Sequence, residues 1–252
     1  MEGYKAPQRD AMFVTHELLD FQSHYQKLGF DEASEDLVSA IFSEAAKFSE
    51  NTLAPINQSG DEEGCKWEDG VVTTPKGFKE AYQTYVEGGW PSMAHPEEFG
   101  GQNLPYSLAS IIAEWFSGAN HSWAMYPGLS QGCMETLKAH GTKEQQEKFL
   151  HKLISGEWTG TMCLTEAHCG SDLGMLKCRA EPQEDGSYSL TGTKIFISAG
   201  EHDMSENIVH IVLARLPDAP EGTKGISLFV VPKFNVSDDG EKQDRNAVSC
   251  GS

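Results

Sequence analysis

The sequence predicts an α+β fold in which an N-terminal helical bundle domain, residues 1–155, precedes an antiparallel β-barrel-like domain, residues 156–252. Apolar residues recur at helical spacing through the first part of the chain. After Gly156 the pattern changes to short runs rich in β-branched and aromatic residues, which turn residues separate. A block of helices followed by a block of strands is typical of this fold class.

The first two expected helices have recognisable starts and stops. One spans residues 34–53 and is expected to end at Pro55, since proline breaks the interior of a helix. The next is expected to open with Thr74 as its cap and Pro75 in its first turn. The adjacent glycines 88 and 89 should stop it.

Two further helices complete the helical part. Apolar residues mark one of them over residues 108–116. Thr142 and Gln145 form a capping-box pattern in front of the other, which carries Phe149, Leu150 and Leu153 on one face. Both segments therefore have an apolar stripe available for a shared core.

The second part of the chain predicts short strands. The dipeptides Asp185-Gly186 and Thr191-Gly192 stand where hairpin turns are expected. The tail from Asn235 onward is polar and closes with neither helix nor strand, so the sequence is expected to stop before a further domain. The expected strands cover residues 158–165, 175–180, 188–191, 194–198, 208–213 and 226–231.

Composition excludes several classes of function. The formal net charge is -19, with 19 basic against 38 acidic residues, which argues against a nucleic-acid partner. No secretory leader and no membrane-spanning apolar run are visible. The six cysteines form no Cys-x-x-Cys pair, so reduced thiols in a cytoplasmic protein are expected. His168 lies beside Cys169, but no suitably spaced ligands follow, and no metal site is predicted.

The most informative stretch is Met-Cys-Leu-Thr-Glu-Ala-His-Cys-Gly-Ser-Asp, residues 162–172. Glycine lets the backbone approach an anion, and successive amides in a turn form an anion-binding concavity, to which the Ser171 hydroxyl adds a donor. Gly-Ser-Asp is equally an ordinary turn that binds nothing in most proteins. Phe196, between two isoleucines, is equally compatible with a core position. The residues alone leave both interpretations open.

The order of residues in this stretch resembles the motif of the acyl-CoA dehydrogenase family. The resemblance covers nearly the whole chain, because residues 88–91, 96–102, 140–145, 156–161 and 191–194 are also similar to family motifs. Within the family, the chain is most similar to the branch of 3-methylmercaptopropionyl-CoA dehydrogenases of bacterial dimethylsulfoniopropionate breakdown. The stretches that indicate this branch are residues 4–7, 60–65, 125–129, 197–203 and 224–234.

The resemblance implies FAD as the cofactor and assigns its contacts. Two positions depart from the family pattern, since Phe196 is commonly Trp and Ala167 is often Pro. Acyl-CoA is expected to pass beside the backbone of Ser171. The implied contacts are Met162, Leu164, Thr165, Phe196 and Ser198 for the flavin and Gly170 and Ser171 for the pyrophosphate.

The resemblance also implies a reaction, in which two hydrogens leave an acyl-CoA thioester. In the family the catalytic base is a Glu of a C-terminal helical domain, which is absent here, so no catalytic residue is assigned and these residues alone are expected to be inactive. Glu166 and Asp172 lie in the motif, but they are expected to hold the turn rather than to act as the base.

Electron-transferring flavoprotein is the implied electron acceptor, and a homodimer or homotetramer in a bacterial cytoplasm is the implied setting. In relatives the flavin site is completed by a neighbouring subunit and by the missing domain. Two alternatives stay open. One is a flavin-dependent acyl-CoA oxidase, and the other is a non-catalytic binding protein on the same scaffold. The acyl-chain preference is not encoded in residues 1–252, because the pocket floor depends on the absent helices.

Overall fold

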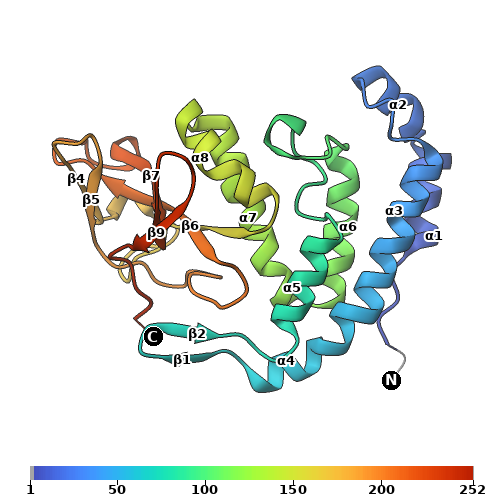
Figure 1. Ribbon diagram of the computed structural model, residues 1–252, viewed down its shortest axis with the longest axis horizontal. Helices are drawn as coiled ribbons and strands as arrows, with labels where there is room; N and C mark the ends of the chain where they lie inside the picture. Colours follow the sequence, from blue (N-terminus) through green and yellow to red (C-terminus); the bar gives the residue numbers. More distant parts are fainter. Residues whose placement is uncertain (1–2, 252) are drawn as a thin grey trace.

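The computed structural model describes residues 3–251 and has helices on one side and a β-sheet on the other (Figure 1). This arrangement confirms the predicted α+β class. The helical side contains α1 (Gln8–Met12), α2 (Phe21–Leu28), α3 (Glu35–Phe48), α4 (Asn57–Glu63), α5 (Phe78–Glu87), α6 (Tyr106–Ala119), α7 (His121–His140) and α8 (Lys143–Ile154). The strands are β1 (Lys66–Glu68), β2 (Val71–Thr73), β3 (Trp158–Cys163), β4 (Arg179–Pro182), β5 (Tyr188–Thr191), β6 (Asn207–Arg215), β7 (Ile226–Pro232), β8 (Phe234–Val236) and β9 (Lys242–Arg245).

The helix predicted over residues 34–53 is present. Ser34 caps α3, because its side chain accepts the Leu37 amide at 3.3 Å. A π-helical segment, Ser49–Leu53, continues the helix to the predicted end. The chain then turns through Pro55 in a short 3-10 helix and enters α4, which the sequence did not predict.

The predicted start of α5 is wrong. The helix begins at Phe78 behind Gly77, whose φ of 92° suits glycine. Thr74 instead donates its amide (3.1 Å) and hydroxyl (2.7 Å) to the Asp203 carboxylate, which ties the helical part to the β-rich part. A carboxylate far along the chain thus replaced the local capping that the sequence suggested. The predicted stop at Gly88 is present.

The last two helices, α7 and α8, form the contact layer for the sheet. Thr142 and Gln145 make the predicted capping box at α8, with both reciprocal bonds present. The helix α7 was not predicted, and it contains Pro127 in its interior. Asn120 caps α7 by accepting the Trp123 amide at 3.0 Å.

Helix α7 packs directly on β3, and this contact requires a glycine. A Cβ atom on Gly160 would lie 2.4 Å from the Cβ of Cys133 on α7. The Gly160 amide donates to the Ser130 hydroxyl at 3.0 Å. A buried apolar cluster from α7, α8, β3 and β6 fills this layer and joins the two parts of the molecule.

The sheet is mixed rather than purely antiparallel. Strand β6 is central, and it pairs with β7 in the predicted antiparallel sense. It pairs with β3 in parallel, with Trp158 opposite Asn207 and Cys163 opposite Val212. The long excursion between β3 and β6 carries the hairpin β4–β5, whose turn at Asp185-Gly186 was predicted. Thr191-Gly192 forms no hairpin turn.

Two other strand predictions were inaccurate. Residues 194–198 form an irregular segment instead of a strand. Of residues 175–180, only Arg179 and Ala180 lie in a strand, because a 3-10 turn (Leu173–Met175) and an irregular stretch precede β4. The segment 194–198 cannot continue as a strand because Phe196 has a φ of 55°.

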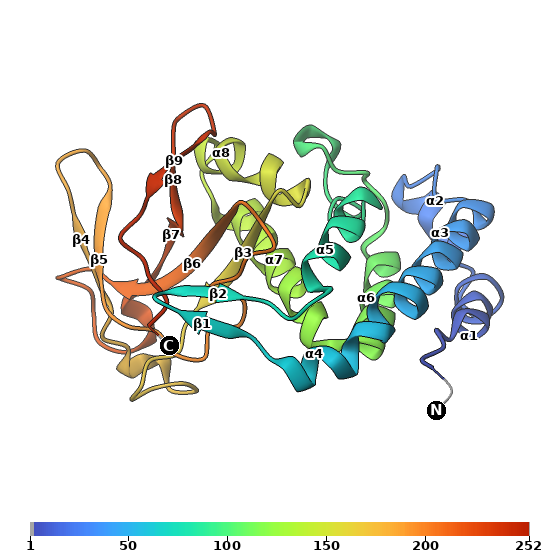
Figure 2. The same ribbon diagram turned by 60° about the horizontal axis from the view of Figure 1, so that its bottom comes forward.

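A two-stranded hairpin, β1–β2, extends from the helical part along the β-rich part (Figure 2). The Trp67 indole on β1 donates to the Cys250 carbonyl at 3.1 Å. Within residues 3–251, none of the helices has the length and apolar character required to cross a membrane.

Candidate functional site

The stretch singled out by the sequence forms a tight bend at the end of β3. The backbones of Glu166 and Cys169 exchange two hydrogen bonds, at 2.9 and 3.0 Å. Gly170, Ser171 and Asp172 follow on the exposed side of this bend. The bend therefore directs residues 170–172 towards solvent, while Glu166 and Cys169 are buried on its inner side.

Glu166 holds the bend from the inside. Its carboxylate accepts the backbone amides of Lys177 (2.8 Å) and Cys178 (2.9 Å) and the ammonium of Lys194 (2.9 Å). Burial on its own raises the pKa of this carboxyl, but the Lys194 ion pair and the two amides outweigh it, so the net pKa is lowered. An ionised, fully bonded carboxylate supports the predicted role of holding the turn.

Lys194 connects the bend to the segment that carries Phe196. Besides Glu166, its ammonium binds the Leu164 carbonyl at 3.0 Å. The next residue, Ile195, donates its amide to the Thr165 carbonyl at 2.9 Å. These bonds place the end of β3 beside residues 194–196, so Thr165 and Phe196 belong to one site.

Phe196 is unusual in both exposure and backbone conformation. Its side chain is 89% exposed, and its φ is 55°. An exposed phenylalanine forgoes burial of its ring, and a left-handed φ is costly for a bulky residue. The core interpretation of Phe196 is therefore wrong. A strained, exposed aromatic ring is the arrangement expected of a ligand contact.

The polar groups near Phe196 have spare hydrogen-bonding capacity. Within residues 3–251, no acceptor is present for the amides of Gly170 and Ser171, and neither the amide nor the hydroxyl of Thr165 has a partner. A Cβ placed on Gly170 would contact only the Thr165 methyl, at 3.6 Å. The bend thus offers bare amides and a hydroxyl beside an exposed ring, which fits the donor set of a flavin nucleotide.

The remaining predicted contacts lie around this centre. Met162 is partly buried and packs against two apolar clusters, and Leu164 packs against one of them. Ser198 is exposed, in a turn closed by the bond from the Gly200 amide to the Ile197 carbonyl at 3.2 Å. Ser171, the predicted substrate contact, is exposed at the bend.

A second cluster includes potential metal ligands. Ligand atoms of Glu166, His168 and Cys169 lie within 4.8 Å of one another. Both carboxylate oxygens of Glu166 already accept donors from the protein, and His168 Nε2 bonds to the Met175 carbonyl at 3.0 Å. The cluster is organised by hydrogen bonds that serve the bend, and we assign it no metal.

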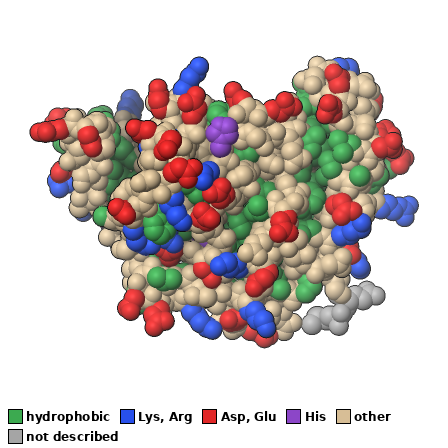
Figure 3. All heavy atoms as spheres, viewed as in Figure 1, with side chains coloured by type: hydrophobic (Ala, Val, Ile, Leu, Met, Phe, Trp, Pro, Cys, Tyr) green, Lys and Arg blue, Asp and Glu red, His purple; other side chains and the backbone are tan. Residues whose placement is uncertain are grey.

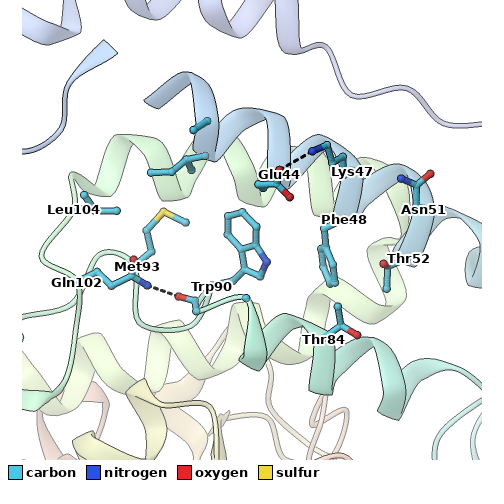
Figure 4. A pocket seen from close by; sticks show the side chains of 14 residues that line it. Glu44, Lys47, Phe48, Asn51, Thr52, Thr84, Trp90, Met93, Gln102 and Leu104 are labelled. Atoms are coloured by element: carbon cyan, nitrogen blue, oxygen red, sulfur yellow. Dashed lines mark hydrogen bonds and ion pairs between the residues drawn. The ribbon is translucent and has the colours of Figure 1, made fainter. Parts of the chain in front are cut away.

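A hollow of about 550 Å³ lies elsewhere, between α3, α5 and the loop of residues 88–104 (Figure 4). Phe48, Trp90 and Met93 give it apolar walls, and the ion pair of Lys47 with Glu44 (2.6 Å) lies on its edge. It contains none of the predicted flavin contacts. We place the candidate site at the β3 bend, because there the unpaired donors and the strained ring converge.

Charge on the surface is predominantly acidic. Asp and Glu side chains are scattered over the face shown in Figure 3, with Lys and Arg between them.

Two basic residues that organise the bend were not identified from the sequence as site residues. They are Lys194 and Arg215. Lys194 lies in residues 191–194, which are similar to a family motif, but the sequence assigned it no role. Only their buried polar contacts reveal them, and no spacing pattern in the sequence encodes those contacts.

Comparison with known proteins adds an independent observation. The family model for the acyl-CoA dehydrogenase N-terminal domain matches residues 36–157, and the model for the acyl-CoA dehydrogenase middle domain matches residues 161–246. A curated 3-methylmercaptopropionyl-CoA dehydrogenase of Ruegeria pomeroyi is 44% identical over 98% of this chain. The chain spans 42% of the length of that relative. The resemblance drawn from the sequence motifs is confirmed.

Solved structures of acyl-CoA dehydrogenases are similar in fold to this chain. Butyryl-CoA dehydrogenase of Megasphaera elsdenii superposes with a TM-score of 0.64 and 25% identity, over 78% of this chain and 48% of its own. An acyl-CoA dehydrogenase of Bacillus anthracis complexed with FAD superposes with a TM-score of 0.63 and 25% identity, over 81% of this chain and 32% of its own. FAD, the cofactor implied by the sequence, is thus bound by a structural relative.

Proposed function

This chain belongs to the acyl-CoA dehydrogenase family, and we propose that its bend after β3 binds FAD for the α,β-dehydrogenation of an acyl-CoA thioester. The observation that carries the proposal is that the unpaired donors of Thr165, Gly170 and Ser171 occur on a bend whose Thr165 is bonded to the residue before the strained, exposed Phe196. FAD, when bound, supplies the acceptor for the hydride that leaves the β-carbon.

The residues of this chain have distinct roles in the proposal. The amides of Gly170 and Ser171 and the Ser171 hydroxyl bind the diphosphate, since successive backbone amides favour an anion. Thr165 donates to the edge of the flavin, and Phe196 covers one flat face and excludes water from it. Met162, Leu164 and Ser198 complete the contact surface. The Glu166–Lys194 pair sets the separation between Thr165 and Phe196.

We propose that neither carboxylate of the bend, Glu166 or Asp172, is the base that removes the α-proton. Glu166 is unsuitable, because its lowered pKa and its bonds to two amides and an ammonium leave it a weak and inaccessible acceptor. Asp172 is exposed and belongs to the bend. The full reaction would therefore need another carboxylate beside the same face.

The finer assignments follow from the relatives. We propose an acyl-CoA substrate, with 3-methylmercaptopropionyl-CoA as the first candidate because of the Ruegeria pomeroyi relative. Electron-transferring flavoprotein is the proposed acceptor, a homodimer or homotetramer the proposed assembly, and the bacterial cytoplasm the proposed location. The domain division at residues 155 and 156 remains a prediction.

Titration of the protein with FAD tests the proposal. We expect saturable binding, seen as a change in flavin fluorescence, that the Ser171→Ala variant weakens by about fivefold, since it removes one hydrogen bond to an anion. Ser189→Ala on the exposed strand β5 is the matched control and should bind like the parent. Equal affinity of Ser171→Ala and the parent would contradict the placement, and no binding by the parent would contradict the function.

A further inference from the structure

Arg215, the last residue of β6, makes an unusual set of contacts. Its guanidinium donates to four backbone carbonyls and to no side chain. Two acceptors, Gly174 (2.7 Å) and Leu176 (2.8 Å), lie in the loop that follows the bend. The other two, Pro220 (3.0 Å) and Gly222 (2.7 Å), lie in the loop between β6 and β7. One side chain thus joins two loops that are far apart in sequence.

The surroundings of this guanidinium leave little space and no counter-charge. A Cβ on Gly225 would lie 2.7 Å from Arg215 Nη1 and 1.9 Å from the Pro220 carbonyl oxygen, so glycine is required there. Among the described residues, no Asp or Glu forms an ion pair with Arg215. The guanidinium is thus held in place by hydrogen bonds to backbone carbonyls rather than by an ion pair with a described carboxylate.

The loop held by Arg215 is continuous with the proposed anion-binding bend. Gly174 is three residues after Ser171, so their Cα atoms lie at most about 10 Å apart. The carbonyls of Gly174 and Leu176 bind Arg215, and the carbonyl between them, that of Met175, binds His168. Carbonyl oxygens that would repel an anion are therefore engaged by donors, while the amides of Gly170 and Ser171 stay unpaired.

We propose that Arg215 is a positioning residue of the flavin site: it fixes the loop of residues 172–176 so that the bend presents its amides to the diphosphate of FAD. The inference rests on the proposed function, because it assigns a role towards the same ligand. Arg215 acts through the loop that its guanidinium holds, and it does not touch the reacting atoms.

The test compares Arg215→Met and Arg215→Lys with a matched control, Arg179→Met. Arg179 is the partner of Arg215 in the register of β4 with β6, but it is exposed and forms a surface ion pair with Glu181. We expect Arg215→Met to weaken FAD binding by about tenfold, Arg215→Lys to recover part of the loss by restoring the charge, and Arg179→Met to bind like the parent.

Hydrogen exchange of the ligand-free proteins separates this role from a general loss of structure. In Arg215→Met, the amides of residues 173–177 should exchange faster, while those of β3, β6 and β7 remain as protected as in the parent. If Arg215→Met binds FAD as the control does, or if Arg215→Lys recovers nothing, the positioning role is overturned. Failure of the parent to bind FAD would instead refute the proposed function, and the exchange result would then still decide whether Arg215 holds the loop.

Discussion

Replacing Lys194 by methionine tests how the bend is held. The side chains of Lys194 and Glu166 are only 9% and 5% exposed, so the ion pair is shielded from water. Breaking a buried pair by removing one partner costs about 3–5 kcal/mol. Glu166 would keep the amides of Lys177 and Cys178 as donors. We therefore expect a loss at the lower end, about 3 kcal/mol in the free energy of unfolding.

Urea unfolding followed by tryptophan fluorescence measures this loss, and a thermal melt should show it as a fall of about 6–12 °C. Lys177→Met is the matched control, because the Lys177 side chain is exposed and binds Glu166 only through its backbone amide. The control should change stability by less than about 0.5 kcal/mol. The double variant Lys194→Met with Glu166→Gln should recover part of the loss, since no unpaired charge is then buried.

The pH dependence provides a second check on Glu166. Its folded pKa lies below its ordinary value of 4.5, so its contribution to stability is complete above that value and disappears as the pH falls through the folded pKa. Without Lys194 the lowering is smaller, and the stability of Lys194→Met should fall less steeply in that range. If Lys194→Met is no less stable than Lys177→Met, the Glu166–Lys194 pair does not hold the bend.

Three other perturbations test separate parts of the account. Phe196→Gly should raise the free energy of unfolding in urea by about 1 kcal/mol, because glycine relieves the left-handed φ. The same variant should bind FAD about tenfold more weakly in a titration. A loss of stability together with the loss of FAD affinity would contradict the strain at Phe196. Gly160→Ala should lower the free energy of unfolding by about 1–3 kcal/mol, because the added methyl group overpacks against α7. Gly128→Ala has open space beside it and should not destabilise the protein. Equal effects of the two variants in thermal melts would refute the close packing at Gly160. Burial lowers the pKa of His202 and His210 to about 4, so the unfolded chain binds more protons than the folded protein below pH 6.5. The free energy of unfolding should therefore fall by about 3 kcal/mol for each histidine as the pH drops from 6.5 towards 4. In pH-dependent urea unfolding, a His210→Gln variant should show a shallower fall, and an unchanged slope would refute this.

The sequence predicted features that depend on local chemistry. The capping box of Thr142 and Gln145 and the hairpin turn at Asp185-Gly186 are present, because each depends on residues a few positions apart. The family motif at residues 162–172 was recognised for the same reason, since its order is contiguous. The change from helix to strand near Gly156 could be located because it too is visible in the pattern of neighbouring residues.

Features that depend on distant residues were missed. Thr74 resembles a helix cap, but Asp203, far along the chain, takes its donors. Phe196 alternates with isoleucines like a strand residue, yet it has a left-handed φ of 55° in a segment whose Lys194 and Ile195 bond to the end of β3. Parallel pairing of β3 with β6 depends on a long connection, and no two-residue turn signals it.

Hydrogen exchange of residues 1–252 with and without saturating FAD tests whether the bend after β3 is the FAD site. We expect slower exchange at residues 164–171 and 194–198, together with the loop of residues 172–176 held by Arg215. Saturable binding with protection confined to the hollow around Trp90, or no protection of the bend at any FAD concentration, would contradict it.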